Sequence, residues 1–195
     1  MNTFVRPTLH CKIKRQTACE HERLRNLMIS LDLFNNVGRY KNFTLAQYYF
    51  HVYVTEIFNV HSVAHLISGI KCAERLNAIK KDMEDLGIVA ENDVLKDLKT
   101  LNIYEALGWL YVSEGSTLGA AILLKSAKES YYLSEHFGAR NLAEHPEGRL
   151  KYWENFINQL NQLNLSLDQQ HLVVDGAFAA FNKFGTMLEN LDELI

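Results

Sequence analysis

A long apolar segment, residues 108–124, constrains the fold more than any other part of the chain. It reads GWLYVSEGSTLGAAILL, which is typical of a buried helix, although Gly115 and Gly119 lie in its middle. An interior glycine costs a helix about 1 kcal/mol relative to alanine, so something must compensate at these positions. Tyr111, Gly115 and Gly119 recur every fourth residue and therefore share one face, with Ser116 beside them. Because this face is nearly bare of side chains, either a neighbouring helix, as in GxxxG contacts, or a flat ligand can approach its backbone.

The remaining sequence predicts helices throughout. Prolines are rare (Pro7 and Pro146), and alternating strand-like runs are scarce. The spacing of apolar residues predicts helices over about residues 8–32, 44–65, 69–86, 101–132, 149–163 and 168–191, with 35–43 and 134–148 as connections. We expect Gly87 to end the third helix and Ser166 or Asp168 to cap the last one. The sequence therefore predicts an all-α fold, with a single domain over residues 1–195.

Composition and charge exclude several classes of function. The net charge is −3, which does not favour a nucleic-acid partner. The N-terminal segment lacks the apolar region of a signal peptide, and no run approaches the roughly 18 uncharged apolar residues of a membrane span. The three cysteines do not form a metal-type pair. We therefore expect a cytoplasmic monomer that spans no membrane and binds no nucleic acid.

Most of the histidines do not form a recognised metal motif. No glutamate has a histidine three residues later, which argues against a di-iron carboxylate bundle. His61 and His65 have the spacing of two metal ligands on a helix but lack the glutamate of His-Glu-x-x-His, so an exposed helix face is favoured. His51 is either a buried hydrogen-bonding residue or part of a pocket, and its spacing favours the former.

His21 differs because it lies on the apolar face of the first predicted helix, in line with Leu24 and Met28. Lys14 lies seven residues earlier. On one continuous helix it would project from nearly the same face, about 10 Å along the axis. That separation matches the distance from the centre of a porphyrin to its propionate edge. A neutral imidazole can bind iron while the lysine meets a carboxylate, although core packing of His21 is an alternative.

Two segments together resemble a known family. Residues 107–121, LGWLYVSEGSTLGAA, resemble the distal helix of bacterial heme oxygenases, and residues 135–149, 152–153 and 160–165 continue the likeness. Residues 17–27, TACEHERLRNL, resemble the proximal-helix segment around the iron-binding histidine. The resemblance extends from about Lys12 to Phe184. It is strongest for the biliverdin-forming enzymes with which pathogenic Gram-negative bacteria take iron from host heme. It implies a heme oxygenase-like helical fold with heme between a proximal and a distal helix.

The resemblance also implies roles for individual residues. His21 would be the axial ligand of the heme iron. The catalytic positions on the distal helix, where backbone lies over the heme, would be Gly115, Ser116 and Gly119. The residues that match heme-binding positions of the family are Lys14, Tyr111, Gln47, His51, Arg75 and Phe181. Among these, Lys14 and Tyr111 would hold the propionates, and Phe181 would line the pocket wall. Gln47, His51 and Arg75 would form a distal polar and water network.

The implied activity is the oxidative cleavage of heme to biliverdin, iron and carbon monoxide with O2, for iron acquisition. Heme would be both substrate and cofactor. The chain has no dinucleotide fingerprint, so we expect no bound nicotinamide or flavin. Electrons would come from a ferredoxin or an NADPH-dependent flavoprotein reductase. Four basic residues lie near the proximal helix: Lys12, Lys14, Arg15 and Arg25. They form either the docking surface for this electron donor or an ordinary solvated helix surface. Two alternatives stay open, a heme carrier or sensor without turnover and a structural helical domain in which His21 only packs.

The distal residue types suit attack on the porphyrin ring. Glycines and a serine offer peptide groups and ordered water to bound oxygen, and not a strong acid that would favour O–O cleavage. Close backbone approach at Gly115 and Gly119 would direct the oxygen towards one meso edge. The propionate anchors decide which edge, and retention of Lys14 and Tyr111 implies α-meso cleavage. Lys125 and Lys128 are possible competing anchors.

Arg25 departs from the family pattern. Many members place a carboxylate one turn after the proximal histidine, where it orients the imidazole through its second nitrogen. A cation cannot accept that hydrogen bond. The role must then pass to water, a backbone carbonyl or another side chain such as Glu22.

Overall fold

The computed structural model describes residues 7–90 and 101–190. Within these ranges the chain is all-α, as predicted, and contains no β-strand beyond isolated bridges at Ser134. The α-helices are α1 (Leu9–Gln16), α2 (Ala18–Ser30), α3 (Val37–Val60), α4 (Cys72–Leu86), α5 (Ile103–Tyr131), α6 (Arg149–Gln162) and α7 (Leu167–Glu189). Two short 3₁₀ helices, η1 (Val63–His65) and η2 (Arg140–Leu142), lie in the connections.

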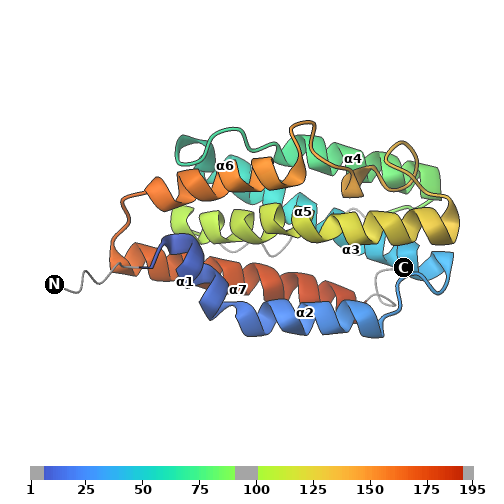
Figure 1. The fold of residues 1–195 in the computed structure, drawn as a ribbon, viewed down its shortest axis with the longest axis horizontal. Helices are drawn as coiled ribbons and strands as arrows, with labels where there is room; N and C mark the ends of the chain where they lie inside the picture. Colours follow the sequence, from blue (N-terminus) through green and yellow to red (C-terminus); the bar gives the residue numbers. More distant parts are fainter. Residues whose placement is uncertain (1–6, 91–100, 191–195) are drawn as a thin grey trace.

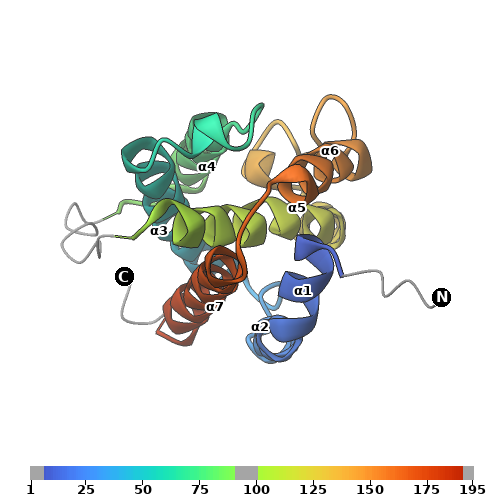
Figure 2. The ribbon, with the colours of Figure 1, turned by 90° about the vertical axis from the view of Figure 1, so that its left-hand side faces the viewer.

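Helix α5 is the central element of the fold. It runs along the molecule between α6 and α4 above and α7, α1 and α2 below (Figure 1). The end view places α5 in the middle, with α3 and α4 on one side and α6 on the other (Figure 2). Every residue from Ala106 to Glu114 is buried. By length and composition α5 could cross a membrane, which the sequence analysis did not expect. Burial of residues 106–114 in the protein core also accounts for the apolar composition of α5.

Two glycines allow α5 and α7 to cross with their backbones in contact. A Cβ atom at Gly108 would lie 2.1 Å from the carbonyl oxygen of Val173, and one at Gly176 would lie 2.1 Å from that of Glu105. Real Cβ atoms do not approach so closely, so both positions require glycine. A glycine-mediated helix contact was one of the two alternatives expected from the sequence, but at Gly115 and Gly119 instead of Gly108 and Gly176.

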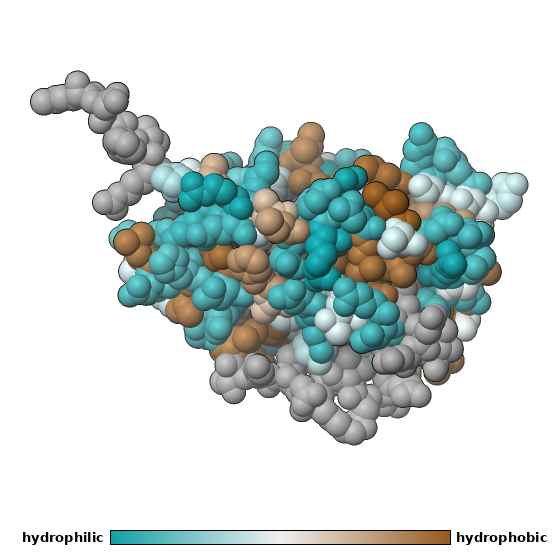
Figure 3. All heavy atoms as spheres, turned by 90° about the horizontal axis from the view of Figure 1, so that it is seen from below, coloured by the Kyte–Doolittle hydropathy of each residue, from teal (hydrophilic) through white to brown (hydrophobic). Residues whose placement is uncertain are grey.

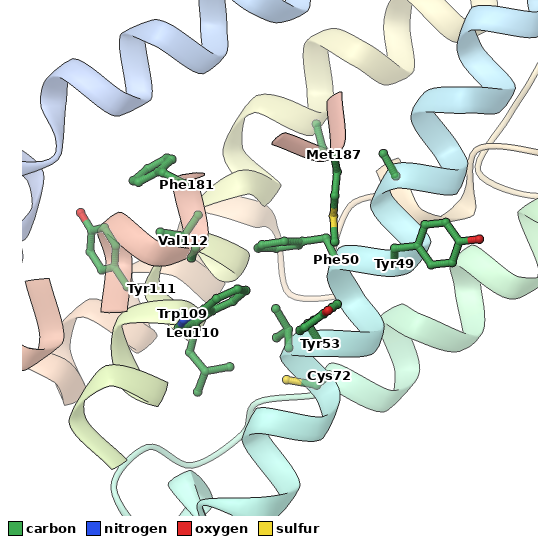
Figure 4. Packing of buried hydrophobic residues seen from close by; sticks show 14 of the residues in the cluster. Tyr49, Phe50, Tyr53, Cys72, Trp109, Leu110, Tyr111, Val112, Phe181 and Met187 are labelled. Carbon is green, nitrogen blue, oxygen red and sulfur yellow. The ribbon is translucent and has the colours of Figure 1, made fainter. Parts of the chain in front are cut away.

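An aromatic stack fills the core on the other side of α5. The ring of Trp109 stacks on Phe50 of α3, with centroids 5.8 Å apart, and on Tyr53, with centroids 6.4 Å apart (Figure 4). Offset aromatic pairs of this kind add to the stability that area burial provides. The stack fixes the buried half of α5 against α3.

The predicted single helix over residues 8–32 is wrong. The chain breaks between α1 and α2 at Thr17, whose backbone angles are φ −96° and ψ 7°. The buried Thr17 hydroxyl donates to the carbonyl oxygen of Ile13 at 2.9 Å. Such bonds from a threonine side chain to the preceding turn bend helices. Lys14 and His21 therefore do not lie along one straight helix axis as expected, because Lys14 belongs to α1 and His21 to α2.

Helix α3 also differs from its prediction. It begins at Val37, inside the predicted connection 35–43, because the side chain of Asn36 accepts from the N–H of Arg39 at 2.9 Å and caps the helix. It ends at Val60, so His61 and His65 do not share a helix face. The expectation that His61 and His65 share an exposed helix face is therefore wrong. Among the described residues, no group of three His, Cys, Asp or Glu side chains could hold a metal ion.

The other boundaries agree with the sequence to within a few residues. Gly87, with φ 62°, ends α4 as predicted. Ser166 caps α7 and forms a capping box with Gln169. The segment 134–148 is a connection as expected, apart from η2. These features were predictable because capping residues and helix-ending glycines act locally.

Candidate functional site

The proximal side of the candidate site is the exposed imidazole of His21 on α2. Its ring meets the Phe181 ring of α7 edge-on, with centroids 6.1 Å apart and an angle of 86° between planes. Figure 4 shows Phe181 at the edge of the aromatic core. Arg23 ties α2 to α7 by donating to Glu189 at 2.8 Å and Asn182 at 3.4 Å. His21 is therefore held against α7 and stays accessible to a ligand.

Arg25 is paired with Glu22. Its guanidinium donates twice to the Glu22 carboxylate, at 3.0 and 2.7 Å. These bonds hold the pKa of Glu22 below its usual value. Glu22, one candidate for orienting the second nitrogen of His21, is therefore already engaged by Arg25.

The two glycines of α5 face different surroundings. A Cβ atom added at Gly119 would meet no atom within 4 Å, so this backbone borders open space. A Cβ at Gly115 would lie 3.3 Å from Cη2 of Trp153 on α6. Gly115 therefore accommodates an indole, as a close helix contact requires, whereas Gly119 leaves room for a ligand.

Ser116 and Arg75 form the polar part of the distal side. The Ser116 hydroxyl donates to the carbonyl oxygen of Ser113 at 2.7 Å and accepts from Nη2 of Arg75 at 2.9 Å. Arg75 also donates from Nη1 to Ser113 O at 2.7 Å and from Nε to Oδ1 of Asn141 at 3.0 Å. Asn141 is fixed in turn because its N–H donates to Asp82 at 2.9 Å. This chain of bonds joins α4 and η2 to the glycine segment of α5.

His51 is a buried neutral base beside this network. Its side chain is 2% exposed, and burial, followed by the charge of Arg75, lowers its pKa well below the usual value. Its Nδ1 has no hydrogen-bond partner among the described residues. Gln47, one turn earlier on α3, is half-buried. A buried polar atom without a partner is uncommon and indicates a place for water or a ligand.

Glu114 and Tyr152 form a buried pair that was not predicted from the sequence. The carboxylate of Glu114 is hydrogen-bonded by the hydroxyl of Tyr152. Burial raises the pKa of Glu114, while Arg75 and Tyr152 counteract this rise. A glutamate in the middle of an apolar helix was a signal that could have drawn attention to it, because buried carboxylates need partners.

Both predicted propionate anchors influence a third residue, His10. Tyr111 Oη lies 3.1 Å from Nδ1 of His10 on α1. Burial lowers the pKa of His10, and the nearby charge of Lys14 lowers it further. Lys14 itself is exposed. His10 was not predicted, because nothing in its local sequence points to Tyr111.

The competing anchors are already paired. Lys128 forms an ion pair with Glu135 at 2.6 Å, and Lys125 lies 3.9 Å from Glu129. Their charges are therefore partly compensated by neighbouring carboxylates, unlike the charge of Lys14, for which no ion pair is found within the described ranges.

The described residues fit a heme. An accessible imidazole on α2 and an open glycine backbone on α5 provide the two features that an axial ligand and a flat macrocycle need. The face that carries α2 and α7 is mainly hydrophilic but has a gathering of hydrophobic side chains in its right half (Figure 3).

Comparisons with known proteins agree with this arrangement. The family model for heme oxygenase matches residues 8–190. The chain is 39% identical over 170 residues to heme oxygenase PigA of Pseudomonas aeruginosa, covering 87% of this chain and 85% of that protein. It also resembles the heme oxygenase of Neisseria meningitidis solved with NO and CO bound, with a TM-score of 0.86 and 31% identity over 97% of this chain and 94% of the other.

A more distant structure shares the fold. The heme oxygenase of Leptospira interrogans has a TM-score of 0.78 at 18% identity and covers 94% of this chain and 100% of its own. The family match covers nearly the whole described chain. It therefore argues against both alternatives, a heme carrier or sensor and a purely structural domain. The chain belongs to the heme oxygenase family and is an enzyme that degrades heme to biliverdin.

Proposed function

We propose that this heme oxygenase opens heme at the α-meso carbon, with His21 as the axial ligand and Lys14 and Tyr111 as propionate anchors. Two observations support the proposal: Tyr111 Oη lies 3.1 Å from Nδ1 of His10, and Lys14 follows His10 by one turn on α1, so the two residues share a helix face. A cation and a hydroxyl that meet at one place can hold a carboxylate and so fix the in-plane rotation of the ring.

The distal residues would direct the oxygen. Bound heme supplies the iron at which O2 is activated and the ring that is opened. Gly119 leaves space for the macrocycle, because a Cβ there would meet nothing within 4 Å. Ser116, held by Arg75 at 2.9 Å, keeps a polar group at this helix without placing an acid there. His51 and Gln47 would hold ordered water, which is supported by the unpartnered Nδ1 of His51.

The reaction would draw electrons from a separate ferredoxin or NADPH-dependent flavoprotein reductase. The exposed residues Lys14 and Arg15 on α1 suit an acidic partner surface. Arg25 contributes less, because its charge is compensated by Glu22. We further propose a single-domain, cytoplasmic monomer over residues 1–195 that serves iron acquisition, in keeping with the sequence resemblance.

The test is an absorption time course. Purified protein receives one equivalent of hemin, then ascorbate or a ferredoxin system in air with catalase present. We expect the Soret band to disappear as a broad red biliverdin absorption grows, and chromatography to identify the α isomer. A dominant β or δ isomer would refute the anchor assignment, and a stable Soret complex without pigment would refute turnover by the protein.

A further inference from the structure

His10 is the hydrogen-bond partner of Tyr111 in this structure, although 101 residues separate the two. Nδ1 of His10 lies 3.1 Å from Tyr111 Oη. The Tyr111 ring is directed away from the stacked rings of Phe50 and Trp109, towards the outside of the core (Figure 4). Tyr111 is buried and His10 is half-buried, so the contact lies at the edge of the core.

His10 is held by contacts with two helices, α5 and α6. Its backbone N–H donates to Oδ1 of Asn161 on α6 at 3.0 Å. Its ring lies edge-on to Trp153 of α6, with centroids 5.9 Å apart, and tilted against Tyr111, with centroids 5.8 Å apart. A ring fixed in this way presents a defined nitrogen to the tyrosine.

The direction of this hydrogen bond decides what Tyr111 can do. A tyrosine has one O–H proton, and a carboxylate only accepts hydrogen bonds. If Tyr111 donated to His10, it would have no proton left for a propionate. If Nδ1 of His10 carries the proton and donates to Tyr111 Oη, the tyrosine proton is free to point at the carboxylate.

We propose that His10 is a positioning residue for heme seating, which donates from Nδ1 to Tyr111 and thereby aims the Tyr111 hydroxyl at a propionate. This inference rests on the proposed function, because it deepens the role of Tyr111 there. In this arrangement Lys14 supplies the positive charge that attracts the propionate. The pair of His10 and Tyr111 sets the direction of the hydrogen bond to that propionate.

The surroundings favour a neutral His10 in this role. Burial and then Lys14, on the same helix, lower its pKa. The groups that face it from α5 and α6 are the uncharged side chains of Tyr111, Trp153 and Asn161. A neutral imidazole donates from one nitrogen only, and the hydrogen-bonded partner selects which one. Arrival of a carboxylate at Tyr111 would therefore select the tautomer protonated at Nδ1.

The experiment compares His10→Phe, which keeps an aromatic side chain but removes both ring nitrogens, with His10→Asn, whose amide can donate near the position of Nδ1. Tyr111→Phe and the double variant complete a cycle. Two quantities are measured: the biliverdin isomer ratio, and the heme-methyl proton NMR pattern of the ferric cyanide complex, which reports heme orientation without turnover.

We expect His10→Phe to lower the ratio of major to minor isomer about fivefold, the size expected for one hydrogen bond, and to populate a second heme orientation. His10→Asn should restore the wild-type pattern, and the double variant should be no worse than Tyr111→Phe. An unchanged isomer ratio and NMR pattern in His10→Phe would overturn the inference, as would additive effects in the double variant.

The controls separate this inference from the proposed function. Absence of biliverdin from the wild-type protein would refute the proposed function, whereas normal α cleavage in both wild type and His10→Phe would refute only the role of His10. If His10→Phe does not fold, His10→Leu replaces it, and the isomer ratio and the heme-methyl NMR pattern again decide whether His10 has the proposed role.

Discussion

The two helices that carry the site are built in opposite ways. In α5 every residue from Ala106 to Glu114 is buried, and the backbone touches α7 at Gly108. In α2 only Leu24 is buried, and His21 is exposed. The distal helix is therefore fixed by packing over its first half before it reaches the open backbone at Gly119. The proximal helix is held by fewer contacts and presents its ligand to the surface. Substitutions should consequently act on stability in α5 and on heme ligation in α2.

The largest expected effect is that of Gly108→Ala. The new Cβ would lie 2.1 Å from Val173 O and 2.5 Å from Ala177 N, both backbone atoms that cannot move aside without separating α5 from α7. We expect the free energy of unfolding to fall by about 3 kcal/mol or more, as for severe overpacking. Urea denaturation followed by circular dichroism measures this. A loss below roughly 1 kcal/mol would show that the α5–α7 crossing is not rigid.

The second largest effect expected is a pH dependence of the free energy of unfolding, which arises from buried His51. Its pKa in the folded protein lies well below the usual 6.5, so the unfolded chain binds more protons between these two values. The contribution of neutral His51 to the free energy of unfolding is therefore fully present above about pH 6.5. It is lost as the pH falls below that value, by up to about 1.4 kcal/mol per pH unit. Denaturation of wild type and His51→Phe between pH 5 and 8 measures the difference. Parallel curves for the two proteins would contradict a buried neutral His51.

Gly119→Ala should separate stability from activity. No atom lies within 4 Å of the added Cβ, and alanine favours a helix over glycine, so stability should rise by about 0.5–1 kcal/mol. Heme turnover should fall, because the methyl group enters the space assigned to the ligand. Gly115→Ala is the matched control, since its Cβ would press on Trp153 at 3.3 Å and should not stabilise. Unimpaired turnover in Gly119→Ala or a bulkier Gly119→Leu would refute the distal assignment.

The smallest effect on stability is expected for His21→Ala. An exposed side chain on α2 contributes little to folding, so the free energy of unfolding should change by less than about 0.5 kcal/mol. The Soret spectrum of the hemin complex should nevertheless lose the features of imidazole ligation, and added imidazole should restore them. If the variant unfolds, or if its spectrum equals that of the wild type, the contrast between the two helices is broken.

Much of the helical framework was predictable from local signals. The span of α5, the end of α4 at Gly87 and the cap of α7 at Ser166 follow from periodicity and capping chemistry, which act within a few residues. The break at Thr17 escaped, because threonine is common inside helices and only a buried hydroxyl bonded to Ile13 O bends this one. The roles of His21 and the distal positions came from the family resemblance.

By itself, the sequence determined the all-α class, most helix boundaries and the family. Only the tertiary structure decided that Gly108 and Gly176, and not Gly115 and Gly119 together, make the backbone contact between α5 and α7. It also decided that Tyr111 meets His10 and that Arg75 holds Ser116. The physical reason is that periodicity shows which face of a helix turns inward. Which residue from a distant helix meets that face depends on how all the helices pack together.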